Sequence, residues 1–475
     1  MAPQEKTAGF DCPKSIFEAS NRLSEGSLSV EALTRHYLAG IDRLQPSLNA
    51  FITITKEEAL RTASRLDEEL RSNRRRGPLH GIPIVYKDNF DTAGVTTTVG
   101  SEIFRNRVPT ENAAAVERLS RAGVVMLGKT NMNEFAAGPS GTNQAFGDIH
   151  NPWDLDRSPG GTSSGTASAV SAGLCVAGTG TDTGGSIRIP ASWTGVSGIR
   201  PTSGRVSMTG IFPRATSLDC CGPIARSVAD LALLLSAMIS ADARDPRSVN
   251  SPVEDPADGL ATELGGVRLG IIRDYTFRDI DPMVGKAIAD SISVFESLGA
   301  VVKTVQIPLL GNKLDYRSVF NILLFEFNQV IRSTYNSTLN RETVFGPVVQ
   351  SDLRRSAQIS TDAYHEAIDA RTKQTDEVRA VFSEVDALIT PTMATTAPLL
   401  STSLEEFDRG RQFMLPFNFV GLPSLTIPCG FSDGLPIGLQ LVCDSMNEAL
   451  LLRIGHAFQS ATDHHKAEPP LYWNG

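Results

Sequence analysis

The sequence predicts an α/β protein, with helices on both faces of a mostly parallel sheet. From Val267 onward, short apolar runs alternate with longer amphipathic segments, which is the order of strands and helices in a parallel sheet. Earlier runs at 82–86 and 124–127 are apolar and short, as buried strands are. The 475 residues suffice for one large domain or two smaller ones, and no internal repeat divides them.

The expected elements follow the chain in order. Helical patterns occur at 15–25, 29–44, 56–76, 113–121, 163–176, 228–239, 282–298, 316–333, 363–382 and 447–460. Strand patterns occur at 51–55, 82–86, 124–127, 269–272, 301–305, 387–390, 424–428 and 437–442, and a further strand leads toward residue 181. Residues 1–12 are expected to be disordered, and 240–265 is the only segment that resembles a linker.

Composition narrows the classes of partner. The chain is 41% hydrophobic and 20% charged, as ordinary globular proteins are. A net charge of −9 argues against nucleic acid or an anionic membrane as a partner. No apolar run is long enough to span a membrane, and the first ten residues lack the apolar core of a signal peptide. The six cysteines suggest buried free thiols in a reducing compartment, so we expect a cytoplasmic protein.

The stretch Ser158–Pro190 is rich in glycine, serine and threonine, and the rest of the chain is organised around it. Glycines beside hydroxyls suit a site where backbone N–H groups must approach a reacting atom. A flexible linker would share this composition. The middle of the stretch, Ala167–Cys175, is apolar, which favours a packed segment over a linker.

Two local matches to known motifs fail on their context. Gly123–Thr130 fits the phosphate-binding pattern G-x-x-x-x-G-K-[ST], but the would-be loop is an apolar strand whose amides belong to a sheet. Gly161–Gly165 fits the nucleophile elbow G-x-S-x-G, but a polar loop precedes it where an apolar strand is required. The later histidines, His365, His456, His464 and His465, lie in helical or polar segments, so an α/β-hydrolase triad is disfavoured.

Four motifs resemble those of the amidase signature family. They are Pro159–Gly165, Thr181–Arg188, Gly81–Asp88 and Gly421–Pro428, at the spacing of that family. The resemblance implies a single α/β/α domain around a large mixed, twisted sheet. This domain would span 13–475, with a core at about 81–230 and a second part at about 266–460.

The resemblance also implies a serine–serine–lysine hydrolase, in which Ser186 matches the nucleophile and Lys87 the base. Lys87 ends an apolar strand, where burial lowers the pKa of a lysine enough for its neutral amine to accept a proton, although such a lysine can also extend to solvent. Asp88 points to the opposite face and is not expected to pair with it. The relay hydroxyl, held by a cis peptide bond in the family, falls on Thr162, with Ser163 as the alternative.

The remaining expectations concern the ligand. The amides of Thr183, Gly184, Gly185 and Ser186 are candidates for an oxyanion hole. The candidate substrate-binding residues are Met132, Gly138, Asp182 and Arg188, although Arg188 could instead anchor its loop. Parts of 131–144 and 311–350 are expected to form pocket walls, and Phe320, Leu323, Leu324, Phe325 and Phe327 could be pocket or core. No metal-ligand spacing or cofactor fingerprint occurs, so neither is expected.

Three functions compete at this stage. The first is a free-standing amidase that cleaves a small amide, anilide or carbamate, with a homodimer left open. The second is the glutamine-hydrolysing A subunit of a tRNA-dependent amidotransferase. The third is a catalytically inactive binding protein of the same fold. Ile189 follows Arg188 where the A subunits usually carry glutamine, which disfavours the second function.

Overall fold

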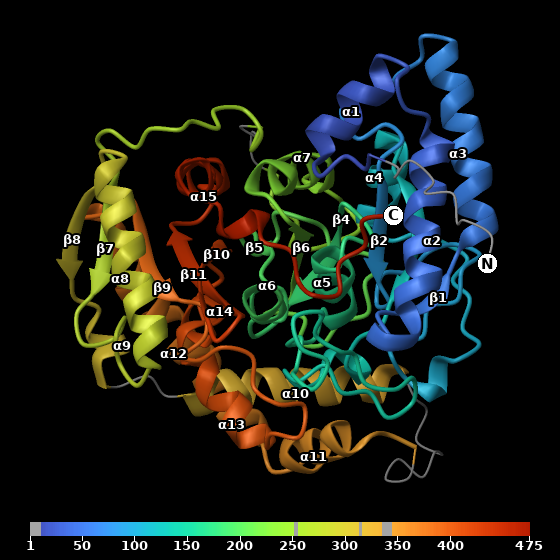
Figure 1. Ribbon diagram of the computed structural model, residues 1–475. Helices are drawn as coiled ribbons and strands as arrows, with labels where there is room; N and C mark the ends of the chain where they lie inside the picture. Colours follow the sequence, from blue (N-terminus) through green and yellow to red (C-terminus); the bar gives the residue numbers. More distant parts are fainter. Residues whose placement is uncertain (1–10, 251–254, 313–315, 335–343) are drawn as a thin grey trace.

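The computed structural model describes residues 11–250, 255–312, 316–334 and 344–475 (Figure 1). Residues 1–10, for which the sequence predicts disorder, lie outside the described residues, as do residues 251–254 of the linker-like segment.

One mixed sheet runs through the described chain, with eleven strands in the order β1-β3-β2-β4-β6-β5-β10-β11-β9-β7-β8. The strands are β1 (Phe51–Ile54), β2 (Pro83–Lys87), β3 (Val125–Thr130), β4 (Ala177–Asp182), β5 (Ser197–Arg200), β6 (Cys220–Ala225), β7 (Arg268–Ile272), β8 (Val301–Val305), β9 (Ala387–Pro391), β10 (Ser424–Ser432) and β11 (Leu435–Cys443). Parallel pairs form two groups, β3-β2-β4 and β9-β7-β8, and the strands between these groups are antiparallel. The expected mixed α/β fold is confirmed.

The antiparallel centre has local causes. Strands β10 and β11 are joined by the two-residue turn Asp433–Gly434, and so short a turn can join only antiparallel strands. The sequence pattern predicts no strand at β5 or β6. Their residues, Ser-Gly-Ile-Arg and Cys-Cys-Gly-Pro-Ile-Ala, are small and lack an alternating pattern, so only pairing with neighbouring strands defines them.

Most helices lie where the periodicity predicts. They are α1 (Ile16–Ser24), α2 (Val30–Leu48), α3 (Lys56–Arg71), α4 (Ala114–Ala122), α5 (Ser164–Ser171), α6 (Arg188–Thr194), α7 (Val228–Met238), α8 (Pro282–Ser297), α9 (Pro308–Asn312), α10 (Tyr316–Thr334), α11 (Pro347–Ser356), α12 (Thr361–Ala380), α13 (Leu404–Arg409), α14 (Leu415–Phe419) and α15 (Glu448–Ala461). Helix α5 ends five residues earlier than expected. Gly173, two residues beyond its end, adopts φ +70°, a left-handed conformation that commonly terminates a helix.

Both faces of the sheet are covered at its centre. All residues of β4, β6 and β11 are buried, which requires packing on both sides of these strands. Helices α7 and α15 pack on β5, β6, β10 and β11, and α5 and α6 pack on the same central part of the sheet. Figure 1 shows α7 and α15 above these strands and α5, α6 and α14 below them.

The glycine-rich stretch wraps one edge of this core. Lys87 is the last residue of β2 and Asp182 the last of β4, and the two strands are parallel neighbours. Their carboxyl ends therefore meet at the same edge of the sheet, which is where open α/β sheets place their ligand sites. Residues 158–163, before α5, and 183–187, before α6, form the loops at this edge.

The segment that matches a phosphate-binding loop is strand β3, as expected. Lys129, its would-be phosphate ligand, is fully buried. Its Nζ donates to the carbonyl of Phe90 at 2.5 Å and to Thr97 Oγ1 at 2.8 Å, and lies 3.6 Å from Asp88. These partners hold the lysine within the sheet layer.

The cysteines fit the expected pattern. Five of the six are buried free thiols, and Cys12 is half-buried. Among the helices of the described residues, none is long and apolar enough to cross a membrane.

Candidate active site

Lys87 is fully buried at the end of β2 and contacts two hydroxyls. Its Nζ donates to Thr162 Oγ1 at 2.7 Å and to Thr181 Oγ1 at 2.8 Å. Burial lowers the pKa of Lys87 from 10.5 to about 7, against the opposing effect of the Asp182 and Asp219 carboxylates. At neutral pH a large fraction of this amine is therefore unprotonated and able to accept a proton.

A second buried lysine shows what is special about Lys87. Lys129 lies 3.6 Å from the Asp88 carboxylate, and burial lowers its pKa only to about 8. Asp88 thus pairs with Lys129 and not with Lys87, as the alternation of side chains along the strand predicts. Among the described residues, the hydrogen-bond partners of the Lys87 amine are hydroxyls, and these stabilise a positive charge less than a carboxylate does.

The two candidate relay hydroxyls have different partners. Thr162 follows a cis peptide bond from Gly161, and its Oγ1 accepts the hydrogen bond from Lys87. The Ser163 hydroxyl instead donates to the carbonyl of Thr181 and accepts from its N–H, both at 3.3 Å. Ser163 therefore ties its loop to the backbone of β4, whereas Thr162 is the residue in contact with the lysine.

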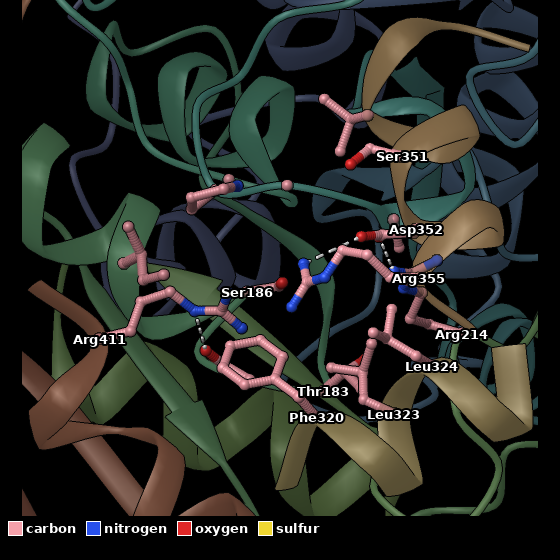
Figure 2. Close-up of a pocket in the computed structure, with 17 residues that line it drawn as sticks. Thr183, Ser186, Arg214, Phe320, Leu323, Leu324, Ser351, Asp352, Arg355 and Arg411 are labelled. Atoms are coloured by element: carbon pink, nitrogen blue, oxygen red, sulfur yellow. Dashed lines mark hydrogen bonds and ion pairs between the residues drawn. The ribbon is translucent and has the colours of Figure 1, made fainter. Parts of the chain in front are cut away.

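Ser186 lines a cavity of about 180 Å³ together with Gly138, Gly161, Thr183 and Gly184 (Figure 2). The carbonyl of Ser186 accepts a 3.1 Å hydrogen bond from the N–H of Ser163, so the two glycine-rich loops are held against each other. The cavity thus opens onto the candidate nucleophile at the edge of the sheet where Lys87 and Thr162 lie.

The loop that carries Ser186 depends on glycine. Gly185 adopts φ +113°, which side-chain-bearing residues rarely adopt, and a Cβ there would meet the sulfur of Met414. The Gly185 N–H donates to the Asp182 carboxylate at 2.9 Å and is therefore already used. The expectation that this N–H belongs to the oxyanion hole is corrected. Within the described residues, the N–H groups of Thr183, Gly184 and Ser186 have no hydrogen-bond acceptor.

Asp182 and Arg188 lie behind the cavity and do not line it. Both are fully buried, and the Arg188 guanidinium makes two 3.0 Å hydrogen bonds to the Asp182 carboxylate. Asn418 donates to the same carboxylate at 2.6 Å, and Gln440 accepts from Arg188 at 2.6 Å. The expectation that Asp182 and Arg188 bind substrate is corrected, because their polar atoms are already used to hold the loop in place.

The pKa of Asp182 agrees with this structural role. Burial alone would raise it, but the guanidiniums of Arg188 and Arg200 and the Asn418 amide hold it well below its ordinary value. Asp182 is therefore a buried anion with fixed partners.

The other two candidate ligand residues differ from each other. Gly138 lines the cavity, as expected. Met132 is fully buried in an apolar cluster with Val99 and Phe135, so its assignment to substrate binding is corrected as well.

Helix α10 supplies the apolar wall of the cavity. It lies within 311–350, one of the two ranges expected to form pocket walls. Phe320, Leu323 and Leu324 line the cavity. Phe327 belongs to the core, and Phe325 stacks on Tyr364 with ring centroids 4.4 Å apart. The apolar face of this helix is thus divided between pocket and core.

Four charged residues that line the cavity are not predicted by any sequence motif. They are Arg214 in the loop before β6, Asp352 and Arg355 on α11, and Arg411 just before α14. Figure 2 shows Arg214, Asp352 and Arg355 grouped beside Ser186, and Arg411 on its other side. No local motif marks these residues in the sequence, since each lies in a segment with ordinary surface composition.

The comparisons with known proteins give one family. The Amidase family model matches residues 32–452. The A subunit of glutamyl-tRNA(Gln) amidotransferase from Hahella chejuensis is 39% identical over 97% of this chain and 99% of its own length. The corresponding A subunit from Chloroflexus aggregans is also 39% identical, over 96% of this chain and 98% of its own.

Solved structures agree with these relatives. The A subunit of glutamyl-tRNA(Gln) amidotransferase from Thermotoga maritima superposes with a TM-score of 0.83 at 32% identity, covering 97% of this chain and 98% of its own. Peptide amidase from Stenotrophomonas maltophilia gives a TM-score of 0.86 at 32% identity, covering 97% of this chain and 99% of its own.

These relatives correct one expectation and favour one of the competing functions. They are subunits named for a tRNA, so the expectation that nucleic acid plays no part is wrong. Net charge is a weak guide to this expectation, because in a complex of several subunits another subunit can carry the contact with nucleic acid. Among the three hypotheses, the relatives support the amidotransferase A subunit better than a free-standing amidase. Both of these hypotheses describe an enzyme that cleaves amides, and the relatives exclude neither of them. The protein is an enzyme that acts on amide C–N bonds, and the chain belongs to the amidase family.

Proposed function

We propose that this chain hydrolyses the side-chain amide of glutamine through an acyl-enzyme on Ser186, as the A subunit of a tRNA-dependent amidotransferase. The observation that carries the chemistry is the 2.7 Å hydrogen bond between buried Lys87 and Thr162, next to the cavity lined by Ser186. The near-complete alignment with amidotransferase relatives supports the choice of glutamine and of a tRNA-dependent assembly.

In this proposal the proton moves along a chain of three residues. Neutral Lys87 accepts a proton from Thr162, which in turn accepts the proton of Ser186. The deprotonated Ser186 oxygen attacks the amide carbon and forms the tetrahedral intermediate. The proton then returns along the same residues to the leaving nitrogen, which departs as ammonia, and water hydrolyses the acyl-enzyme by the same route.

The negative charge of the tetrahedral oxygen needs fixed donors. We assign this role to the N–H groups of Thr183, Gly184 and Ser186, which have no acceptor within the described residues. The Asp182–Arg188 pair, together with the Gly185 N–H, holds the loop in the shape that presents them. Thr181 keeps the Lys87 amine directed toward Thr162.

A free-standing amidase for other small amides is the second candidate. Ile189, which occupies the position of a glutamine in most A subunits, lines the cavity, and the peptide amidase fold covers nearly the whole chain. Both candidates use the same catalytic residues and differ in substrate and partner. We also propose that the protein works in a reducing compartment, as its free cysteines suggest, and this location is compatible with either candidate function.

The decisive experiment measures ammonia release by the purified chain, alone and combined with the other subunits of a tRNA-dependent amidotransferase. Glutamine, a simple aliphatic amide and an anilide are compared, with Ser186→Ala as the blank. We expect glutamine hydrolysis that rises when partners and tRNA are present. Hydrolysis of the other amides by the chain alone, with glutamine left intact under both conditions, would instead establish the second candidate.

A further inference from the structure

We propose that Asn89 is a positioning residue of the candidate active site, which keeps the Lys87 amine unprotonated by donating a hydrogen bond to the hydroxyl of Thr181. This inference rests on the proposed role of Lys87 as the base that activates Ser186. It adds a residue that does not line the cavity and that acts on the base through a hydroxyl which both of them contact.

The hydrogen bonds of Thr181 are the first observation. Its Oγ1 accepts from Lys87 Nζ at 2.8 Å and from Asn89 Nδ2 at 3.3 Å. All three residues are buried, so bulk water does not compete for these contacts. A protonated amine can only donate, so a charged Lys87 requires the Thr181 oxygen to accept from two donors at once. The two donors compete for one oxygen, which therefore stabilises the ammonium less than a hydroxyl free of Asn89 would.

The orientation of the Asn89 amide follows from its second contact. Nδ2 also donates to the carbonyl of Phe212 at 3.4 Å, and a carbonyl can only accept. The NH₂ end of the amide must therefore face Phe212 and Thr181, which directs the positive end of its dipole toward the hydroxyl that Lys87 contacts. If Thr181 instead donates its own hydrogen to the neutral amine, the hydrogen bond from Asn89 strengthens that donation. Both arrangements favour the neutral amine.

A purely structural role does not account for the Asn89 side chain. The N–H of Phe212 already donates to the backbone carbonyl of Asn89 at 2.8 Å, so the two segments are joined without the side chain. The Asn89 Oδ1 is buried and has no hydrogen-bond donor among the described residues. An unpaired buried acceptor lowers stability, and each one in a folded protein calls for an explanation. The N–H donor at the other end of the same amide supplies that explanation here.

The charged groups that face Lys87 act in the opposite direction. Asp182, at the end of β4, and Asp219, just before β6, raise the pKa of Lys87, whereas burial lowers it to about 7. Lys129, on the neighbouring strand β3, is held by its own carboxylate partner at 3.6 Å. Asn89 therefore acts together with burial and against the two carboxylates.

The test measures how the labelling of Ser186 by a fluorophosphonate depends on pH, which requires no amide substrate. The serine oxygen displaces fluoride from phosphorus while the serine proton passes through Thr162 to Lys87, so the rate falls as pH decreases through the pKa of the lysine. Asn89→Leu should move this acidic limb to higher pH by about 0.5 to 1 unit, the size of one net hydrogen bond. The rate on the plateau above the limb should stay close to that of the wild type, whereas a general disturbance of the site would lower the plateau.

Three further variants assign the shift. Asn89→Asp keeps the shape and places a carboxylate one hydroxyl away from Lys87, so the limb should move to higher pH by about one to three units. The matched control is Asn112→Asp, which adds the same charge outside the cavity and keeps the Oδ1 that accepts from the N–H of Ala93 at 2.7 Å. It should leave the limb in place. In a Thr181→Val background, Asn89→Leu should cause no further shift, because the shared hydroxyl is gone.

An unmoved limb in folded Asn89→Leu overturns the inference, whatever Asn89→Asp does. A shift that persists in the Thr181→Val background, or one of equal size in Asn112→Asp, overturns it as well. If Asn89→Leu does not fold, Asn89→Asp decides, since an upward shift supports the inference and an unmoved limb overturns it.

Failure of the proposed function is recognised separately. A protein that is labelled with the expected limb but leaves glutamine intact loses only the proposed substrate, and the inference stands. Absence of labelling in the wild type, or a limb that survives Lys87→Ala, removes the base and overturns both.

Discussion

Replacing Thr162 by valine tests the proton relay most directly. Valine keeps the branched shape of threonine and removes only the hydroxyl, so the wall around Lys87 stays filled. The 2.7 Å hydrogen bond from Lys87 to Thr162 is then lost, while the 2.8 Å bond to Thr181 still holds the amine. We expect the fold to survive and the proton route between Ser186 and Lys87 to be broken.

The expected loss of kcat follows from the role of Thr162 in proton transfer. Positioned proton transfer contributes roughly two to four powers of ten, so kcat should fall by about that factor in Thr162→Val. Thr162→Ser keeps the hydroxyl and should retain activity. Ser163→Ala removes two 3.3 Å hydrogen bonds to the backbone of Thr181, and it should cost about 1–3 kcal/mol of stability while kcat stays within tenfold of the wild type.

The assay is kcat for amide hydrolysis, together with thermal or denaturant unfolding of each variant. The expected pattern is a crossed one, in which Thr162→Val loses activity with little change in stability and Ser163→Ala loses stability with little change in activity. An active Thr162→Val beside an inactive, stably folded Ser163→Ala would refute the assignment and make Ser163 the relay.

The further predictions concern three neighbouring residues. Ser186→Ala should abolish turnover and labelling by a fluorophosphonate while the melting temperature stays close to that of the wild type; residual turnover within tenfold would mean another nucleophile. Because the conjugate acid of Lys87 has a lowered pKa of about 7, kcat/KM should fall as pH decreases through that value, and an acidic limb below pH 5 would point to a different base. Lys87→Ala should be inactive at every pH tested, and recovery of its rate at high pH would contradict the proposed mechanism. Gly185→Ala should lose activity because Gly185 adopts φ +113°, which side-chain-bearing residues rarely adopt, and unchanged kinetics would show that this loop tolerates displacement.

Local sequence was enough to predict the α/β fold class, whereas the candidate catalytic residues came from the resemblance of four motifs to the amidase signature family. Strand and helix periodicity is local, and it located most elements because burial on one or two faces imposes a repeat on neighbouring residues. Lys87, Thr162 and Ser186 could be assigned through that resemblance because their motifs are local. Each lies in a short motif whose glycines or apolar neighbours are needed to bring backbone and side chain to the edge of the sheet, so the requirement is written within a few residues.

Tertiary packing, in contrast, sets which polar residues face the cavity. Asp182 and Arg188 belong to the same motif as Ser186, yet both are buried behind the cavity, where they pair with each other. The motif alone does not show which of its residues supports the loop and which contacts the substrate. Arg355 and Arg411 come from separate segments that meet only when α11 and the turn before α14 pack beside the loop of Ser186. An arginine that lines a pocket and one on the surface have the same local sequence pattern, since the difference lies in residues far away in the chain that pack against them.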